Sequence, residues 1–191
     1  MNTIQHKHNK IAFMDMDGFI AKYDRKAYMK EYGINPNKAQ FEDEVAHYFL
    51  TCERDNNAYV LVKNILEEYD ESYFLTTVPP EMSWHIPDKI TWLHDCVPEI
   101  DTDTQLLIAE SDKAETIMVL QQLKTLTKDM ILIDDYNPNL FAWEAAGGTA
   151  IKYLNGINTK ESWDGIYITR EEALIPGILN IKLKEYYEKG A

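Results

Sequence analysis

Short apolar runs alternate with longer segments of helical periodicity along most of the chain. The short runs are bounded by polar or turn-forming residues, which is typical of buried strands, and the longer segments repeat apolar residues as amphipathic helices do. The pattern predicts strands at 10–14, 72–75, 105–109, 130–133 and 149–154, with a short sixth strand at 167–168. It predicts helices at 59–69, 84–96, 113–126 and 137–147, and a last helix from about 170 to 189.

Strands that alternate with helices favour right-handed crossovers and a parallel sheet that is covered on both faces. We therefore expect an α/β fold, with a three-layer Rossmann-like arrangement of helices around one parallel sheet. Ligands of such folds bind outside the carboxyl ends of the strands. The residues that follow each predicted strand are therefore the first place to look for chemistry.

The stretch from 21 to 69 interrupts this alternation, because it holds two or three predicted helices between the first two strands. Helices are expected at 21–33 and 39–50, separated by the turn residues Asn35-Pro36-Asn37. We interpret the stretch as a small helical cap inserted after the first strand. The predicted core then comprises 1–20 and 70–191, and the predicted cap comprises 21–69.

Two helix starts carry a capping pattern, in which a short polar residue is followed three positions later by Glu. Asp112 with Glu115 is expected to begin the helix that runs to about 126. Thr169 with Glu172 is expected to begin the C-terminal helix.

Charge and composition exclude several classes of function. The 191 residues carry 32 acidic and 19 basic side chains, a formal net charge of −13. Such a surface repels phosphate backbones and anionic membranes, and no apolar run approaches the roughly 18 residues of a membrane helix. We expect no long nucleic acid and no membrane as partners. The cations of residues 1–10 precede no apolar stretch, so we expect no signal peptide.

Cys52 and Cys96 are the two cysteines, and they lack the spacing of a metal site. They indicate reduced thiols of a cytoplasmic protein, with a single disulfide left open as the alternative.

Asp15-Met16-Asp17-Gly18 follows the first predicted strand and is the sharpest motif of the chain. Two carboxylates separated by one residue can have different roles. One can face a metal and an electrophile, while the other acts as acid or base. Gly18 permits a tight departure of the backbone. A calcium-binding EF-hand loop is excluded, because its glycine and glutamate positions hold Ile20 and Lys26. The alternative is a solvated acidic turn.

Polar residues also follow three later strands. Thr76 can donate to a phosphoryl oxygen, Lys113 can neutralise one, and Asp134 with Asp135 can complete a metal site. Each has an ordinary alternative, respectively a strand end, a solvated lysine and a helix-entry turn. Four such features in succession, each after a predicted strand, favour the functional interpretation.

This ordered set resembles the motifs of the haloacid dehalogenase superfamily. Response-regulator receivers use similar residue types, but in a different order along the chain. Within the superfamily the chain looks most like the 5′(3′)-deoxyribonucleotidase group, over roughly 10–163. The resembling segments are FMDMDGFIA at 13–21, FLTTVPP at 74–80, PDKITW at 87–92, SDK at 111–113 and LIDDYNPNLFAWEAAGG at 132–148. One departure is Phe19, where that group usually carries a small aliphatic residue.

The resemblance implies a phosphomonoesterase that works through an aspartyl-phosphate. Asp15 would attack phosphorus, and Asp17 would protonate the leaving oxygen and then deprotonate the hydrolytic water. Thr76 and Lys113 would hold the phosphoryl oxygens and offset their charge.

The resemblance also implies Mg²⁺ as the cofactor. The ion would bind the Asp15 carboxylate, the backbone carbonyl of Asp17 and Asp134. Asp135 would orient these groups from outside the coordination sphere. Such a hard ion is normally held by a few oxygens together with water and phosphate.

On the substrate side, Phe19 must lie next to Asp17, so we expect it to line the pocket, and we expect Thr77 to bind substrate beside Thr76. The resemblance brings Lys89 towards the phosphate, and the alternative is a surface lysine beside a core tryptophan. Aromatic residues of the expected cap are interpreted mainly as its own core, with one or two free to stack on a base: Tyr23, Tyr28, Tyr32, Phe41, Tyr48 and Phe49.

The substrate is expected to be a nucleoside or deoxynucleoside monophosphate. Another small phosphate ester, such as a sugar phosphate, is the enzymatic alternative. A domain that binds Mg²⁺ and phosphate, or a partner protein, without turnover is the non-catalytic one. A homodimer is left open.

Overall fold

The computed structural model describes residues 9–24, 30 and 47–189. Its centre is a six-stranded sheet of strand order β3-β2-β1-β4-β5-β6, and every neighbouring pair is parallel. The strands are β1 (Ile11–Met14), β2 (Glu71–Thr77), β3 (Leu106–Ala109), β4 (Met130–Asp134), β5 (Thr149–Leu154) and β6 (Ile166–Thr169). The predicted α/β fold with one parallel sheet is confirmed, and each predicted strand is present.

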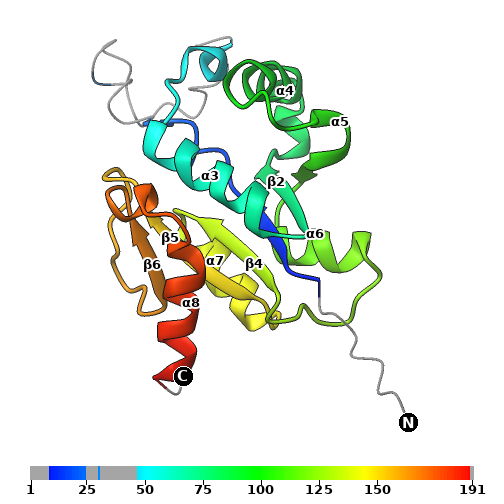
Figure 1. Cartoon of the computed structure of the whole chain (residues 1–191). Helices are drawn as coiled ribbons and strands as arrows, with labels where there is room; N and C mark the ends of the chain where they lie inside the picture. The colour runs from blue at the N-terminus through cyan, green and yellow to red at the C-terminus, as the bar shows by residue number, and fades with distance from the viewer. Residues whose placement is uncertain (1–8, 25–29, 31–46, 190–191) are drawn as a thin grey trace.

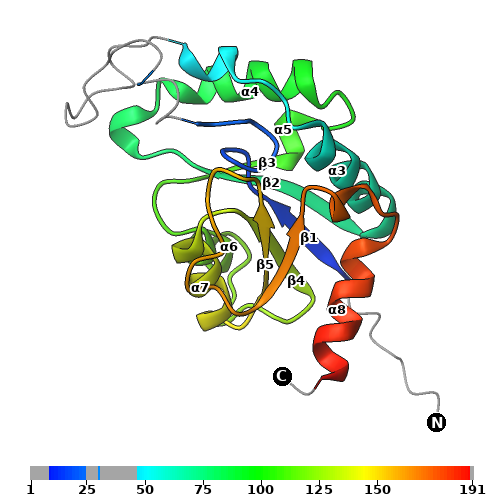
Figure 2. The same ribbon diagram turned by 90° about the vertical axis from the view of Figure 1, so that its left-hand side faces the viewer.

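Helices cover both faces of the sheet (Figures 1 and 2). On one face lie α3 (Asn56–Glu68) and α8 (Ile178–Glu188), and on the other lie α6 (Lys113–Leu120) and α7 (Asn137–Ala145). Successive strand residues point to opposite faces. Ala12 and Met14 therefore belong to the core under α3, whereas Phe13 packs edge-on against Trp143 of α7, with ring centroids 5.2 Å apart.

A further layer lies over the carboxyl ends of the strands, where α4 (His85–Cys96) packs on η1 (Tyr48–Thr51) (Figure 2). The Trp92 indole N–H donates to the Cys52 carbonyl at 2.8 Å, and the rings of Phe49 and Trp92 meet edge-on. Short elements complete the chain: η2 (Pro80–Met82), α5 (Thr102–Gln105) and η3 (Glu172–Leu174). In the described part of the chain, no helix is both long and apolar enough to cross a membrane.

Helix α3, which lies within the stretch 21–69 expected as a cap, packs on the sheet. The buried residues of α3 share a core with strand residues of the sheet. Because α3 lies between β1 and β2 in the sequence, it is the crossover helix of that parallel pair. At the other end, Ala21 forms β-bridges with Asp17 and Arg54 instead of starting a helix. Within the expected cap, 25–29 and 31–46 lie outside the described residues.

Both capping patterns form, but one begins a different element. The Asp112 carboxylate accepts from the Glu115 N–H at 2.8 Å and begins α6 as predicted. Thr169 and Glu172 exchange the reciprocal hydrogen bonds of a capping box, yet the element that follows is the short η3 and not the C-terminal helix. The last helix begins only after Gly177, whose φ is 71°.

The predicted end of α6 at 126 is also wrong, because the helix ends at Leu120. Gln122 adopts a left-handed φ of 54°, and its N–H donates to Val119 while that of Leu123 donates to Met118. These two bonds are the Schellman arrangement that closes a helix.

Candidate active site

The centre of the site is the junction of β1 and β4. The strand order changes direction there, because β2 and β3 lie on one side of β1 and β4, β5 and β6 lie on the other. Ligands of open parallel sheets bind at such a switch of direction. Met14 pairs with Ile133, so Asp15 and Asp134 leave neighbouring strands at the same level. The Asp15 N–H donates to the Ile133 carbonyl at 2.9 Å, which fixes the backbone from which the first carboxylate projects.

Lys113 joins these two carboxylates. Its Nζ lies 2.6 Å from Asp15 Oδ1 and 2.7 Å from Asp134 Oδ2, and its side chain is 1% exposed. Burial raises the pKa of Asp15 well above its usual value, Asp134 adds to the rise, and Lys113 opposes it. Burial alone would lower the pKa of Lys113, but Asp134 and Asp15 outweigh it and raise that pKa. The lysine therefore stays an ammonium between the two acids.

Asp134 is fully buried and its two oxygens are already engaged. Oδ1 accepts from the Tyr136 N–H at 2.8 Å, and Oδ2 accepts from Lys113 and, at 2.9 Å, from Asn139 Nδ2. Its side chain is not part of the cavity wall, which Asp135 lines instead. Of the two neighbouring aspartates, Asp135 therefore lies at the cavity wall and Asp134 lies behind it.

Asp135 is held through one oxygen. Oδ2 accepts from Asn155 Nδ2 at 2.7 Å and from Asn158 Nδ2 at 2.6 Å. Burial, followed by the charge of Asp134, raises the pKa of Asp135 to about 7. Gly18 has a φ of 81°, and a Cβ there would lie 2.2 Å from Asp135 Oδ2. The glycine is therefore required both by the backbone conformation and by the close approach of the carboxylate.

A second lysine reaches the other motif carboxylate. Lys89 Nζ lies 2.5 Å from Asp17 Oδ1 and 3.0 Å from Thr76 Oγ1, with the Phe49 ring centroid at 4.2 Å. The Lys89 side chain is 4% exposed, whereas that of Asp17 is 31% exposed. Lys89 is therefore a buried partner of Asp17, and the alternative of a surface lysine is wrong.

The two threonines at the end of β2 face different surroundings. Thr76 is fully buried, and its hydroxyl accepts from Lys89. Thr77 lines the cavity, and its buried Oγ1 has no hydrogen-bond partner among the described residues. Adjacent strand residues point to opposite sides, so only one of them can face the reacting group. Thr77 is the one that faces the cavity, and Thr76, the residue expected to hold phosphoryl oxygens, faces Lys89.

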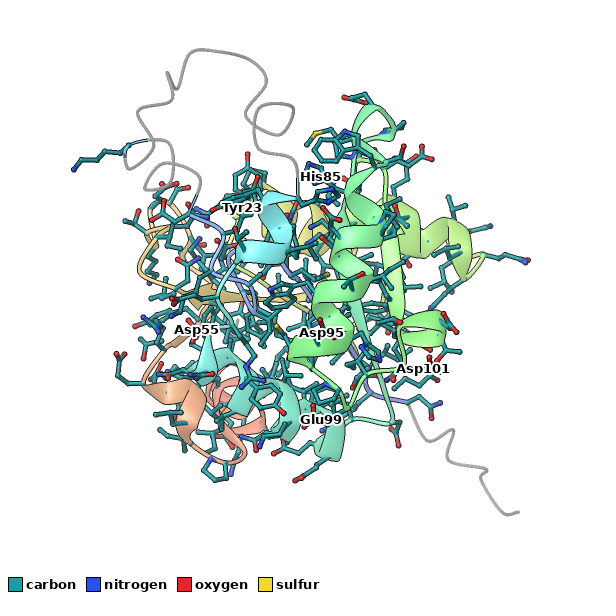
Figure 3. All side chains as sticks on the ribbon, turned by 90° about the horizontal axis from the view of Figure 1, so that it is seen from above. Tyr23, Asp55, His85, Asp95, Glu99 and Asp101 are labelled. Atoms are coloured by element: carbon teal, nitrogen blue, oxygen red, sulfur yellow. The ribbon has the colours of Figure 1, made fainter. Side chains whose placement is uncertain are left out.

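A cavity of about 210 Å³ opens at this end of the sheet, and a smaller slot of about 40 Å³ adjoins it. The cavity is lined by Asp15, Asp17, Gly18, Tyr23, Thr77, Lys113, Asp135, Tyr136, Asn139 and Asn158. The slot is lined by Asp17, Tyr23, Phe49, Thr77, Val78, Pro79, Met82, His85 and Lys89. Figure 3 looks down on this end, with Tyr23 beside η1 and His85 at the start of α4. Asp17 stands where cavity and slot meet.

Phe19 does not contribute to either space. It is 1% exposed and packs edge-on against Tyr153, with ring centroids 5.0 Å apart. The expectation that it lines the pocket because it follows Asp17 is wrong, since the tight turn at Gly18 directs the ring into the core.

Three asparagines of the site were missed by sequence reasoning, namely Asn139, Asn155 and Asn158. Asn155 directly follows β5, so the rule that ligands lie at the carboxyl ends of strands could have indicated it. Asn139 lies on α7 inside the resembling segment 132–148, where it was not singled out, and Asn158 lies in a loop that no motif marks.

The donor set suits a hard cation. Carboxylate oxygens of Asp15, Asp134 and Asp135 lie within 4.8 Å of one another, and all three residues are buried. Oxygen-only donor sets favour Mg²⁺, Ca²⁺ or Mn²⁺ over the softer metals. The residues present therefore fit the ion expected from the sequence.

Comparison with solved structures shows the fold. A haloacid dehalogenase-like hydrolase from Burkholderia xenovorans matches with a TM-score of 0.54 and 13% identity, over 87% of this chain and 98% of the other. A HAD hydrolase of family IA, variant 3, from Entamoeba histolytica gives 0.54 and 12%, over 86% and 97%. A hydrolase from Pseudomonas syringae gives 0.53 and 11%, over 96% and 99%.

No protein-family model and no curated protein matches the sequence. At these identities the likeness establishes a shared fold, and the chemistry has to be argued from the site itself.

Proposed function

We propose that this chain is a Mg²⁺-dependent phosphomonoesterase of the haloacid dehalogenase type, acting through an aspartyl-phosphate. The observation that carries the proposal is the arrangement around Asp15. Its carboxylate is held by Lys113 at the wall of a cavity that Asp17 and Thr77 also line. A nucleophile, an acid and a free hydroxyl donor thus face one space large enough for a phosphoryl group.

Mg²⁺ would be held by the Asp15 carboxylate, the Asp17 backbone carbonyl and a carboxylate of the β4 end. We assign this last position to Asp135, because Asp134 already accepts three hydrogen bonds and does not line the cavity. Asp134 then has the orienting role, through Lys113. When bound, the ion supplies positive charge that offsets the charge of the transferred group.

In the first step, an Asp15 oxygen forms a bond to phosphorus while the bond from phosphorus to the ester oxygen breaks. The leaving oxygen keeps that electron pair and takes a proton from Asp17, so the alcohol departs neutral. In the second step, Asp17 takes a proton from water as the water oxygen bonds to phosphorus. The bond between Asp15 and phosphorus breaks, its electron pair returns to the carboxylate, and inorganic phosphate leaves.

The remaining polar groups bind and orient. The Lys113 ammonium and the Thr77 hydroxyl lie where they can donate to the phosphoryl oxygens, and their donation offsets the charge that develops there. Lys89 holds Asp17 Oδ1, which leaves the other oxygen of that carboxylate for proton transfer. The Thr76 hydroxyl fixes Lys89 in turn.

The substrate we propose first is a nucleoside or deoxynucleoside monophosphate. The slot supports this choice, because it adjoins Asp17 and its lining includes the aromatic residues Tyr23 and Phe49, which suit contact with the base of a leaving nucleoside. Another small phosphate ester, such as a sugar phosphate, uses the same chemistry and would depend more on the polar groups of the slot.

A panel of phosphate esters tests the proposal. Purified protein with Mg²⁺ should release phosphate from 5′- or 3′-nucleotides, sugar phosphates or an aryl phosphate. Asp15→Asn should lower this release at least about a thousandfold, because it removes the nucleophile. Asp103→Asn is the control, since Asp103 is exposed and remote from the cavity. Absence of release across the panel, or full activity in Asp15→Asn, would contradict the mechanism.

A further inference from the structure

The loop after β5 holds two asparagines that meet the strand-end loops of β1 and β4. Asn155 is buried, and its amide nitrogen donates to the Gly18 carbonyl and to Asp135 Oδ2, both at 2.7 Å. Its amide oxygen accepts from the N–H groups of Ile157 and Asn158, at 2.7 and 2.8 Å. Asn155 therefore ties three loops together.

Asn158 acts on the same acceptor from the cavity side. Its amide donates to Asp135 Oδ2 at 2.6 Å, and its side chain lines the cavity. Both asparagines thus converge on a single oxygen of Asp135. Among the hydrogen bonds of the described residues, Oδ1 receives none from a side chain, so it is available to a ligand in the cavity.

The backbone of Asp135 is fixed as well. Lys152, which is 1% exposed, donates from Nζ to the Asp135 carbonyl and to Asn137 Oδ1, both at 2.6 Å. Gly18 lies directly against the Asp135 carboxylate and limits its movement on that side. Main chain and one carboxylate oxygen are therefore held from separate directions, which fixes the direction of the other oxygen.

We propose that Asn155 and Asn158 are positioning residues that aim Asp135 Oδ1 at the cation. The inference rests on the proposed function in that it takes Mg²⁺ as the cation. Groups that orient a metal-ligating side chain typically change metal affinity 10- to 100-fold when removed. The two asparagines are expected to act on metal binding itself, before any chemistry.

Isothermal titration calorimetry of the metal-free protein with MgCl₂ measures this directly. Asn155→Ala and Asn158→Ala should each weaken Mg²⁺ binding about 10- to 100-fold. Asn180→Ala is the matched control, because Asn180 Nδ2 donates to Glu68 Oε2 at 2.6 Å on the exposed surface. The control should keep the wild-type affinity, and circular dichroism should show that all variants are folded.

A double-mutant cycle distinguishes positioning from a general structural effect. In an Asp135→Asn background, Asn155→Ala should weaken Mg²⁺ binding further by less than about threefold, because its effect runs through the lost carboxylate. A full additional loss would overturn the inference. So would wild-type affinity in both single variants. If Asn155→Ala fails to fold, Asn158→Ala still decides, since it removes one side-chain bond from an exposed position.

The outcome is separable from that of the proposed function. If both variants bind Mg²⁺ more weakly but the wild-type protein cleaves no phosphate ester, the inference stands and the proposed phosphatase activity is refuted. Phosphate release with unchanged Mg²⁺ affinity in the variants would do the reverse.

Discussion

Each carboxylate of the Asp-x-Asp motif pairs with a different buried lysine, and the surroundings of these two lysine–carboxylate pairs differ. Lys113 lies between Asp15 and Asp134, and the three side chains are at most 7% exposed. Lys89 is equally buried, but its partner Asp17 is 31% exposed and borders both the cavity and the slot. Both sets border the cavity, but the first is almost fully buried at its wall, whereas Asp17 of the second is partly exposed and also borders the slot.

This difference matches the chemistry proposed for each carboxylate. A nucleophile has to stay in one place while phosphorus approaches, and the enclosed pair gives Asp15 a single position. An acid that also serves as base has to exchange protons with an alcohol and then with water, which requires access. The comparison suggests that burial sets the division of labour within the Asp-x-Asp motif.

The largest expected effect is a difference in the free energy of unfolding when the lysine of each pair is replaced. Lys113→Met leaves two buried carboxylates without a counter-charge, so in EDTA it should lower the free energy of unfolding by about 3–5 kcal/mol. Lys89→Met should cost only about 1 kcal/mol, because water can solvate Asp17. Urea unfolding curves of both variants measure the difference. Equal losses would refute the contrast in enclosure.

The next effect concerns the hydroxyl that faces phosphate. Thr77→Val should lower kcat/KM about 100-fold, because it removes a donor to the charge that develops on the phosphoryl oxygens. Thr76→Val should lower it less than about tenfold, since it acts only through Lys89. Steady-state kinetics on one phosphate ester compare the two. A larger loss in Thr76→Val would return the phosphate-binding role to Thr76.

A smaller effect appears in the pH dependence of stability without metal. The pKa of Asp135 is raised to about 7 in the folded protein, above its ordinary value of 3.8. The folded state therefore binds more protons than the unfolded state between these values, and this group's contribution to stability is lost as pH rises from about 4 to 7.

Asp135→Asn removes this titration. Relative to wild type, the variant should gain about 1–3 kcal/mol between pH 5 and pH 8 in EDTA. Denaturant unfolding at both pH values provides the measurement. A constant difference between the two proteins would show that Asp135 is not held in a proton-binding environment.

The smallest effect tests a residue that belongs to neither pair. Phe19→Leu should lower the free energy of unfolding by about 1 kcal/mol, because the edge-on contact with Tyr153 is lost. Its KM should stay within about twofold of wild type, since the ring lines neither cavity nor slot. A selective rise in KM would restore the pocket role expected from the sequence.

The sequence predicts the sheet better than the details of its ends. The strand at 149–154 has the predicted bounds, because Gly147 and Gly148 mark its start in the sequence, whereas β2 continues to Thr77 through pairing with Ala109, which an apolar pattern does not show. The early end of α6 depends on Gln122, which takes a left-handed conformation that a glycine would have signalled.

The site residues show the same limit, because a sequence pattern does not show which of two adjacent residues faces the cavity. Local motifs locate Asp15 and Asp17, but the choice between adjacent residues at 76 and 77, or at 134 and 135, depends on strand phase. A shift of one residue reverses the side that a strand residue faces. Asn155 contacts residues far from it in sequence, so its contribution is visible only when the strands are assembled.

Gly18 and Asp135 give the fold an evolutionary constraint. Their separation leaves no room for even one methyl group, so position 18 cannot gain a side chain while Asp135 keeps its place. Among relatives of this chain, the two positions are therefore expected to covary. A sequence with any side chain at position 18 should carry a smaller residue at position 135, and with it a different ligand for the cation that we propose.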